Sequence, residues 1–197
     1  MAEMTHTKPR ISMTRRITYG AVLLALSLVL PQLFHLAGAT PAGAVFLPMH
    51  IPVLLGGLIL GPAFGLGIGA FAPILSFAVT GMPMAARLPF MIIELAAYGF
   101  IGGLFYQTFK LYKKWIGVYA ALIGAMIIGR LAYGLSIVVA GSLFGLANMR
   151  LQAVITATMT GAIGIVIQLI IIPPIVLALK KGGHLDGFIS NREQLTQ

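Results

Sequence analysis

Hydrophobic residues dominate the chain in long runs that charged residues rarely interrupt. The runs cover residues 17–35, 45–60, 62–79, 88–109, 115–139 and 153–179. About 20 apolar residues are enough for one helix to cross the hydrocarbon core of a bilayer. Gly61 and Pro62 separate the second run from the third, because this residue pair interrupts helices. The pattern predicts six transmembrane helices in a single membrane domain that comprises residues 1–197.

The composition indicates the same class of protein. Hydrophobic residues make up 59% of the chain and charged residues only 9%, and the mean hydropathy is +1.00. Soluble domains carry about 25% charged residues, so this chain has too few to cover a water-facing surface. We therefore expect an all-α integral membrane protein. The chain has no cysteine and so offers neither a disulfide nor a thiolate metal ligand.

The basic residues predict how the helices are oriented. Arg87 and Arg150 lie on one side, Arg130 lies inside a run, and the remaining ten lysines and arginines lie on the other side. These ten are Lys8, Arg10, Arg15, Arg16, Lys110, Lys113, Lys114, Lys180, Lys181 and Arg192. Basic loops stay in the cytoplasm, so both termini are expected there. The net charge of +9 thus orients the chain in the lipid bilayer and does not indicate a nucleic-acid partner.

The N-terminus allows a second interpretation. Its basic start, apolar run and "AGA" sequence also resemble a secretory signal with a cleavage site. Cleavage would remove the first span and leave five, whereas the later helices would keep their orientation.

Two opposite charges interrupt the apolar runs. Glu94 lies six residues after Leu88, and Arg130 lies nine residues before Val139, so both are expected about 9–13 Å below the outer boundary. A charge at this depth is costly unless it is paired or hydrated. The two residues are therefore expected to form an ion pair between helices, to line a pocket for a polar solute, or to relay protons.

Neighbouring residues favour the pocket. Tyr98 follows Glu94 by four residues and Tyr133 follows Arg130 by three, so each tyrosine shares a helix face with a charge. Aromatic walls with a few convergent polar groups are typical of small-molecule sites. His50, Arg87 and Asn148 are expected on the same outer side and complete the set of candidate solute-binding residues, although a histidine at a membrane boundary is often only interfacial.

Small residues predict close helix packing. Gly57 and Gly61 form a G-x-x-x-G pair, and glycines crowd the following run at Gly65, Gly67 and Gly69. Such spacings let helix backbones approach each other. Thr156, Thr160 and Gly164 form a comparable stripe in the last run.

Motifs of several enzyme classes are missing from the sequence. It contains no G-x-x-x-x-G-K-[ST] loop, no H-E-x-x-H pair and no G-x-S-x-G elbow. We therefore expect a transport subunit without its own ATPase, cofactor or metal rather than an enzyme.

The chain resembles the substrate-binding S components of energy-coupling factor (ECF) transporters. "AVLLA", from Ala21 to Ala25, matches an A-x-x-x-A pattern of their first helix. "LPMHIPVLLGGLILGP", "GLGIGAFAPILSFAVTGMP" and "ELAAYGFIGG" are similar to the second to fourth helices of one branch. The resemblance implies vitamin import across a bacterial or archaeal cell membrane, with a solute pocket near the outer face. It also implies docking on a membrane coupling subunit with two cytoplasmic ATPases, which use the ATP, and a partner-facing role for Ala21 and Ala25.

The residues give a first hypothesis for the solute. Arg130 can bind a carboxylate and Glu94 a hydroxyl or amide donor, and pantothenate has all of these groups. Pyridoxine-type, thiamin-precursor and cobalamin-type solutes stay open, and the argument for an anion fails if Glu94 and Arg130 satisfy each other. The alternatives are a proton-coupled secondary transporter of a small polar solute that uses Glu94, and a structural assembly subunit that binds no solute.

Overall fold

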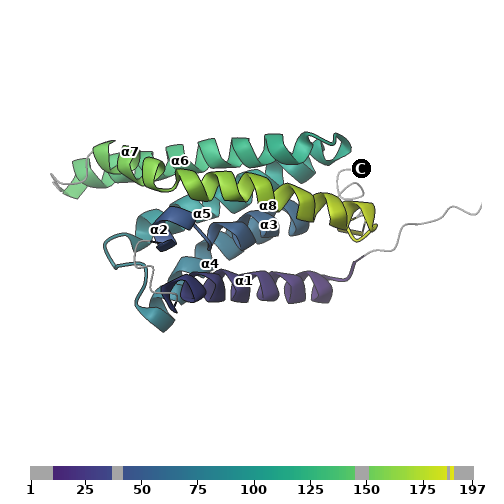
Figure 1. Cartoon of the computed structure of the whole chain (residues 1–197), viewed down its shortest axis with the longest axis horizontal. Helices are drawn as coiled ribbons and strands as arrows, with labels where there is room; N and C mark the ends of the chain where they lie inside the picture. The colour runs from purple at the N-terminus through teal and green to yellow at the C-terminus, as the bar shows by residue number, and fades with distance from the viewer. Residues whose placement is uncertain (1–10, 37–41, 145–150, 186, 189–197) are drawn as a thin grey trace, which may run out of the picture.

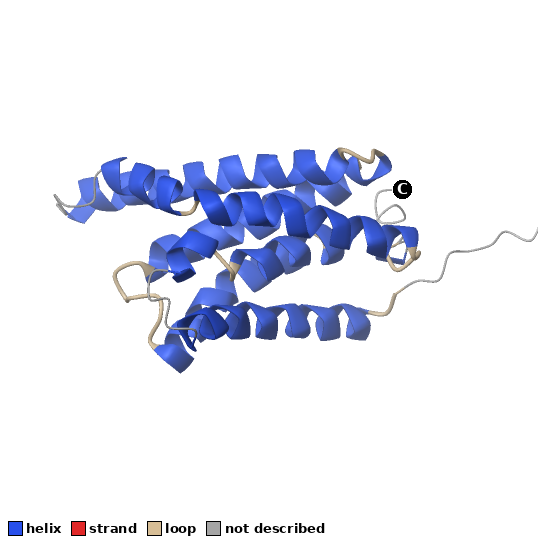
Figure 2. Cartoon of the chain, in the orientation of Figure 1, coloured by secondary structure: helices blue, strands red, loops and turns tan. Residues whose placement is uncertain are grey.

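The computed structural model describes residues 11–36, 42–144, 151–185 and 187–188, and these residues contain helices and no strands (Figures 1 and 2). The longer helices are α1 (Met13–Leu36), α4 (Pro62–Thr80), α5 (Leu88–Gly103), α6 (Gly117–Phe144) and α8 (Ala162–Lys181). The shorter ones are α2 (Ala42–Phe46), α3 (His50–Leu60), η1 (Leu104–Thr108), η2 (Leu111–Lys113) and α7 (Leu151–Thr160). The described part of the chain is therefore an all-α bundle.

Five segments of this bundle are long and apolar enough to cross a membrane. They are Met13–Leu33, Pro62–Thr80, Leu88–Thr108, Gly117–Leu143 and Ala162–Lys181. The first four of them agree with predicted spans, and the fifth agrees with the predicted span 153–179 only from Ala162 onward. The Gly61–Pro62 boundary is also confirmed: Gly61 has a φ of 99°, which favours glycine, and Pro62 is the first residue of α4.

The remaining predicted span, 45–60, differs from the structure. It is divided into α2 and α3, because Leu47 has a φ of 48° and precedes Pro48, a position that disfavours helix. With 11 residues, α3 is about 16 Å long, against about 30 Å for the hydrocarbon core. Nine of those residues are buried, so other helices surround α3 and shield it from lipid. Interrupted helices are tolerated at membrane depth under that condition.

The last predicted span is interrupted as well. The structure places the end of α7 at Thr160 and the start of α8 at Ala162, with Gly161 between them. The two helices continue in nearly the same direction in Figure 1. This junction matters because it lies beside the buried arginine described below.

Close glycine contacts hold α3, α4 and α5 together. A Cβ atom added at Gly57 would lie 2.1 Å from the carbonyl oxygen of Gly99, and one added at Gly65 would lie 2.2 Å from the same oxygen. Gly69 meets the Leu95 carbonyl oxygen at 2.2 Å in the same way. The predicted close approach is thus confirmed at these three glycines, whereas Gly67 has no atom within 4 Å of its Cβ position.

The end of α5 supports the short helix α3. The last turns widen into the π-helical segment η1, and Phe109 donates to the carbonyl oxygen of Leu104. Within η1, the amide nitrogen of the buried Gln107 donates to the carbonyl oxygens of Leu58 and Ile59 at 2.9 and 2.8 Å. These carbonyls belong to the last turn of α3, where helical partners are missing. Gln107 therefore satisfies a helix end that water does not reach.

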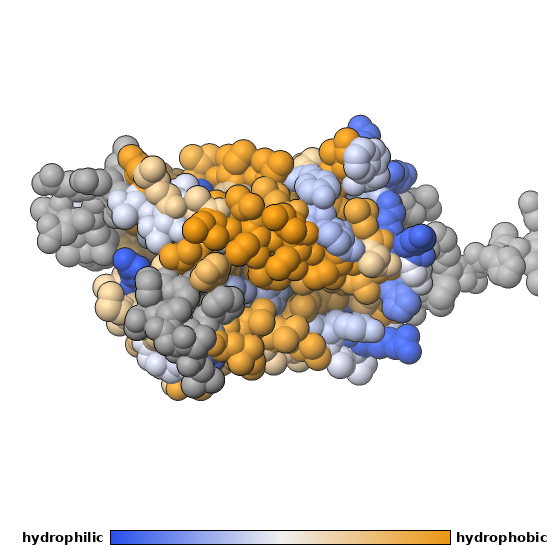
Figure 3. Space-filling view, viewed as in Figure 1, coloured by the Kyte–Doolittle hydropathy of each residue, from blue (hydrophilic) through white to orange (hydrophobic). Residues whose placement is uncertain are grey.

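Basic residues gather at one end of the bundle. Arg16 near the start of α1 donates to the carbonyl oxygen of Phe188 at 2.6 Å, and Lys180 at the end of α8 donates to that of Tyr112 in η2. The three described basic clusters therefore share one end, as the sequence predicts. Figure 3 shows hydrophilic residues at that end and a hydrophobic middle section.

Candidate solute-binding site

Glu94 and Arg130 form an ion pair between α5 and α6. Nη1 of Arg130 lies 2.8 Å from Oε1 of Glu94, and the Glu94 side chain is only 6% exposed. The first of the three predicted arrangements, an ion pair between adjacent helices, is therefore present. Pairing lowers the cost of placing both charges inside the bundle.

Two further residues converge on this pair. Nε2 of His50, at the start of α3, lies 3.9 Å from Oε1 of Glu94, and His50 is 2% exposed. Tyr98 lies one turn after Glu94 on α5, and the charges of Glu94 and Arg130 both act on its hydroxyl. The His50 and Tyr98 rings contact edge to face with their centroids 5.2 Å apart. We call His50, Glu94, Tyr98 and Arg130 the polar cluster.

The polar cluster has unused hydrogen-bonding capacity. Within the described part of the chain, Nε and Nη2 of Arg130 and both ring nitrogens of His50 are buried without a hydrogen-bond partner. Oε1 of Glu94 is close to Nη1 of Arg130 but lacks hydrogen-bond geometry. Buried polar groups are usually paired, and leaving one unpaired is costly. The cluster can therefore still donate to, and accept from, a bound molecule.

The other predicted site residues take different positions. Tyr133 is half-buried on α6, and the charges of Glu94, Arg87 and Arg130 all act on its hydroxyl. Arg87 is exposed immediately before α5. Asn148 lies outside the described residues. The structure thus brings four of the predicted residues into contact. Tyr133 is close enough to feel their charges, and Arg87 is exposed at the start of α5.

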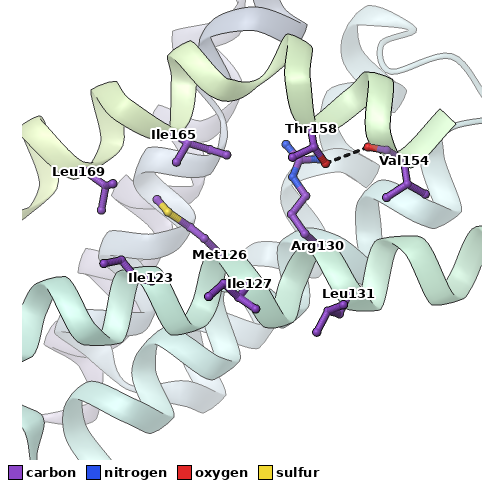
Figure 4. A pocket seen from close by; sticks show the side chains of 9 residues that line it. All are labelled: Ile123, Met126, Ile127, Arg130, Leu131, Val154, Thr158, Ile165 and Leu169. Carbon is purple, nitrogen blue, oxygen red and sulfur yellow. Dashed lines mark hydrogen bonds between the residues drawn. The ribbon is translucent and has the colours of Figure 1, made fainter. Parts of the chain in front are cut away.

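A groove lies next to the polar cluster, between α6 and the α7–α8 pair (Figure 4). Its volume is about 460 Å³, within the range of about 300–1,000 Å³ that is usual for ligand pockets. It is lined by Ile123, Met126, Ile127, Arg130, Leu131, Val154, Thr158, Ile165 and Leu169. Arg130 therefore belongs both to the ion pair and to the groove wall.

Glycines make room for the cluster. A Cβ atom at Gly161, in the α7–α8 junction, would lie 2.9 Å from Nη2 of Arg130 and 2.9 Å from Cδ1 of Leu47. A Cβ atom at Gly129 would lie 2.9 Å from the Tyr98 ring. Sequence reasoning missed both positions. Two features of the sequence could have indicated them. Gly129 directly precedes Arg130, and Gly161 lies inside the last apolar run.

A helical bundle with several membrane-length apolar segments and a buried polar cluster defines a multi-pass membrane protein. Residues 15–176 match the family described as ECF transporter, substrate-specific component. The chain belongs to this family, whose members are substrate-binding transport subunits rather than enzymes and work with an ECF module. Comparisons with curated proteins and with solved structures gave no match.

Proposed function

We propose that the chain binds a vitamin-type micronutrient at the polar cluster and delivers it for import by ATP-hydrolysing partners. One observation carries this proposal: a buried acid, base, histidine and tyrosine meet inside the bundle, while four of their nitrogens have no hydrogen bond to any described residue. Buried polar groups in membrane proteins usually mark a solute or ion pathway. The bundle's membership of the substrate-specific family supports a solute.

Each residue of the cluster has a distinct role in this proposal. Glu94 holds Arg130 in place through the 2.8 Å contact, which leaves Nε and Nη2 to donate to the solute. Tyr98 provides an aromatic wall beside Glu94 and contacts the His50 ring, and His50 offers its ring nitrogens from α3. Tyr133 and Arg87 lie further out and meet the solute as it enters.

Hydrogen bonding, rather than net charge, guides our choice of solute. Glu94 and Arg130 face each other at 2.8 Å, so the pair as a whole does not attract an anion by net charge. Pantothenate remains the first individual solute to test, because its carboxylate, hydroxyl and amide groups match the unused donors of Arg130 and the carboxylate of Glu94. The alternative solute to test is a neutral vitamin that has hydroxyl and amide groups but no carboxylate.

The partner surface is proposed on α1. Ala21 and Ala25 are both exposed, one helical turn apart. Small side chains at this spacing let another helix approach closely. We propose that this strip contacts the membrane coupling subunit, and that two cytoplasmic ATPases attached to it supply the energy in a bacterial or archaeal cell membrane.

Enlarging this strip tests the partner proposal. Ala21→Leu or Ala25→Leu should strongly reduce co-purification with the coupling subunit while solute binding stays unchanged, because both residues are exposed on α1, a helix that supplies no residue of the polar cluster. Val22→Leu is the matched control, since Val22 is already a large exposed residue on α1. Loss of solute binding with intact assembly would contradict the assignment.

Uptake by proteoliposomes tests the energy source. With coupling and ATPase subunits present, ATP inside the vesicles should drive accumulation, and a collapsed proton gradient should leave it running. Dependence on the proton gradient without ATP would instead establish the alternative, a secondary transporter that uses Glu94.

A further inference from the structure

Lysines from two distant segments meet at the basic end of the bundle. Nζ of Lys180, at the end of α8, donates to the carbonyl oxygen of Tyr112 in η2. This contact brings the segment with Lys113 and Lys114 next to the segment with Lys180 and Lys181. We call these four residues the lysine cluster. The preference of basic residues for one side of a membrane explains why they lie at this end, but it does not bring them together at one place.

The lysine cluster has no acidic partner in the described part of the chain. The only acidic residue among the described ones is Glu94, whose carboxylate pairs with Arg130. Lys180 is partly buried and uses one of its three ammonium donors on Tyr112, and the other members of the cluster are exposed. The cluster can therefore still donate several hydrogen bonds to an anion.

The lysine cluster lies where apolar segments end. Residues 109–116 connect the membrane-length segments Leu88–Thr108 and Gly117–Leu143, and α8 ends with Lys180 and Lys181. The ends of membrane-spanning segments lie at the level of the lipid headgroups. The cluster is therefore expected at the depth of the phosphate groups of one leaflet.

The connection between α5 and α6 has a defined shape. The backbone N–H of Lys114 donates to the carbonyl oxygen of Leu111 at 3.0 Å, and that of Gly117 donates to the carbonyl oxygen of Lys114 at 3.1 Å. A Cβ atom added at Gly117 would collide with the carbonyl oxygen of Leu111, so the connection folds closely against the start of α6. The lysines of this connection are therefore held in place and can contribute to one binding site.

Exposed apolar side chains accompany the lysines in this connection. Phe109, Trp115 and Ile116 are 61%, 72% and 52% exposed. Tryptophan is enriched at membrane–water interfaces, where its apolar ring meets lipid. An anionic phospholipid matches both features, because its phosphate attracts lysines and its acyl chains cover apolar side chains. A soluble phosphate compound would leave the apolar side chains uncovered.

We propose that the lysine cluster binds the phosphate headgroup of an anionic phospholipid, whose acyl chains lie against Trp115 and Ile116. This site is distinct from the polar cluster and does not depend on which solute is transported. Figure 1 shows α1 and α6 along opposite edges of the bundle, so a lipid bound at the lysine cluster leaves the proposed partner strip on α1 uncovered.

The test uses the fluorescence of Trp115, which is the single tryptophan of the chain. The full chain is reconstituted in phosphatidylcholine vesicles that contain either brominated phosphatidylglycerol or brominated phosphatidylcholine at the same mole fraction. Brominated lipids quench a tryptophan that they contact. Brominated phosphatidylglycerol should bind beside Trp115 about fivefold or more tightly than brominated phosphatidylcholine, because its net negative charge is attracted by the lysines.

Lysine variants locate the site. The double variant Lys113→Gln with Lys114→Gln, and separately Lys180→Gln, should each reduce the preference for phosphatidylglycerol about fivefold. Arg15→Gln is the matched control, because Arg15 is an exposed base at the same end of the bundle but lies on α1, and its variant should keep the preference. Quenching by brominated phosphatidylcholine should be the same in all variants, since Trp115 still contacts lipid.

Four results would overturn the inference. Equal quenching by the two brominated lipids would show that the site has no preference for an anionic headgroup. An equal loss in Arg15→Gln would show that the charge of the whole basic end, rather than the lysine cluster, attracts the lipid. Displacement of brominated phosphatidylglycerol by glycerol phosphate at constant ionic strength would identify a soluble phosphate compound as the occupant. If binding of the coupling subunit and the ATPases abolishes quenching by both lipids, the lysine cluster is a protein-docking surface instead.

Discussion

Arg130 links the two features on which the functional account depends. Its Nη1 lies 2.8 Å from Glu94, while Nε and Nη2 are buried without a hydrogen-bond partner in the described part of the chain. The sequence offers an ion pair and a solute pocket as alternatives, but one guanidinium has enough donors to serve both. The acid then positions the base, and the base binds the solute.

Breaking this pair should destabilise the protein. Glu94→Gln leaves the Arg130 guanidinium buried without a counter-charge, and disrupting a buried pair costs about 3–5 kcal/mol. Thermal unfolding of the purified chain should therefore occur at a clearly lower temperature. The double variant Glu94→Gln with Arg130→Gln is the control and should recover part of the loss, since no unpaired charge remains. Equal unfolding of Glu94→Gln and the original chain would show that the pair is not energetically coupled.

The position of the guanidinium should depend on Gly161. In Gly161→Ala, the new methyl group would lie 2.9 Å from Nη2, so Arg130 has to move and solute affinity should fall about tenfold or more. Gly67→Ala is the matched control, because no atom lies within 4 Å of its added Cβ. Isothermal titration with the solute measures both. Unchanged solute affinity in Gly161→Ala would show that the α7–α8 junction does not position Arg130 for solute binding.

At the scale of elements, the short helix α3 brings His50 to the cluster. Because α3 begins only at His50, its first turn lies at the depth of Glu94 rather than at the membrane boundary. This arrangement needs support at the far end of α3. Gln107 binds carbonyls in the last turn of α3, and Gly57 lets α5 approach its backbone. The interruption of the second predicted span is therefore part of how the site is built.

The packing of α4 against α5 provides an element-scale prediction. In Gly99→Ala, the added Cβ would lie 2.1 Å from the carbonyl oxygen of Gly65, so the two helices have to separate. The variant should yield little folded protein in size-exclusion chromatography. Gly102→Ala, on the same helix, should be tolerated, because its Cβ makes only ordinary contacts of 3.6 and 3.8 Å. Normal folding of Gly99→Ala would show that the close contact is not required.

Much of this organisation was readable from the sequence, for definite reasons. Glu94 and Arg130 stand out because ionisable residues are rare in apolar runs, and Gly61–Pro62 is a strong helix break. The break at Leu47 was signalled only by the following Pro48, and the Gly161 junction has no proline at all. The groove was not predictable, because helices in a membrane are apolar on every side and the sequence does not show which apolar face lines a cavity.

At the scale of the whole molecule, the position of the basic clusters predicts the orientation in the membrane. The natural chain has no cysteine, so single-cysteine variants can report which side is accessible. A membrane-impermeant maleimide added outside intact cells should label Arg87→Cys and should label Lys113→Cys only after permeabilisation. Both parent residues are exposed, so accessibility is not limited by burial. The opposite labelling pattern would show that the basic end of the bundle faces outward, which contradicts the expected cytoplasmic termini.

The most direct test of the central claim is calorimetric titration of the purified chain with a panel that includes pantothenate and other vitamins. The account predicts that one solute binds at micromolar concentration or below, and that Glu94→Ala and Arg130→Ala each abolish this binding. Ala21→Leu should bind the same solute normally. Binding that survives in both cluster variants would place the site elsewhere, and a folded chain that binds no member of the panel would contradict the account.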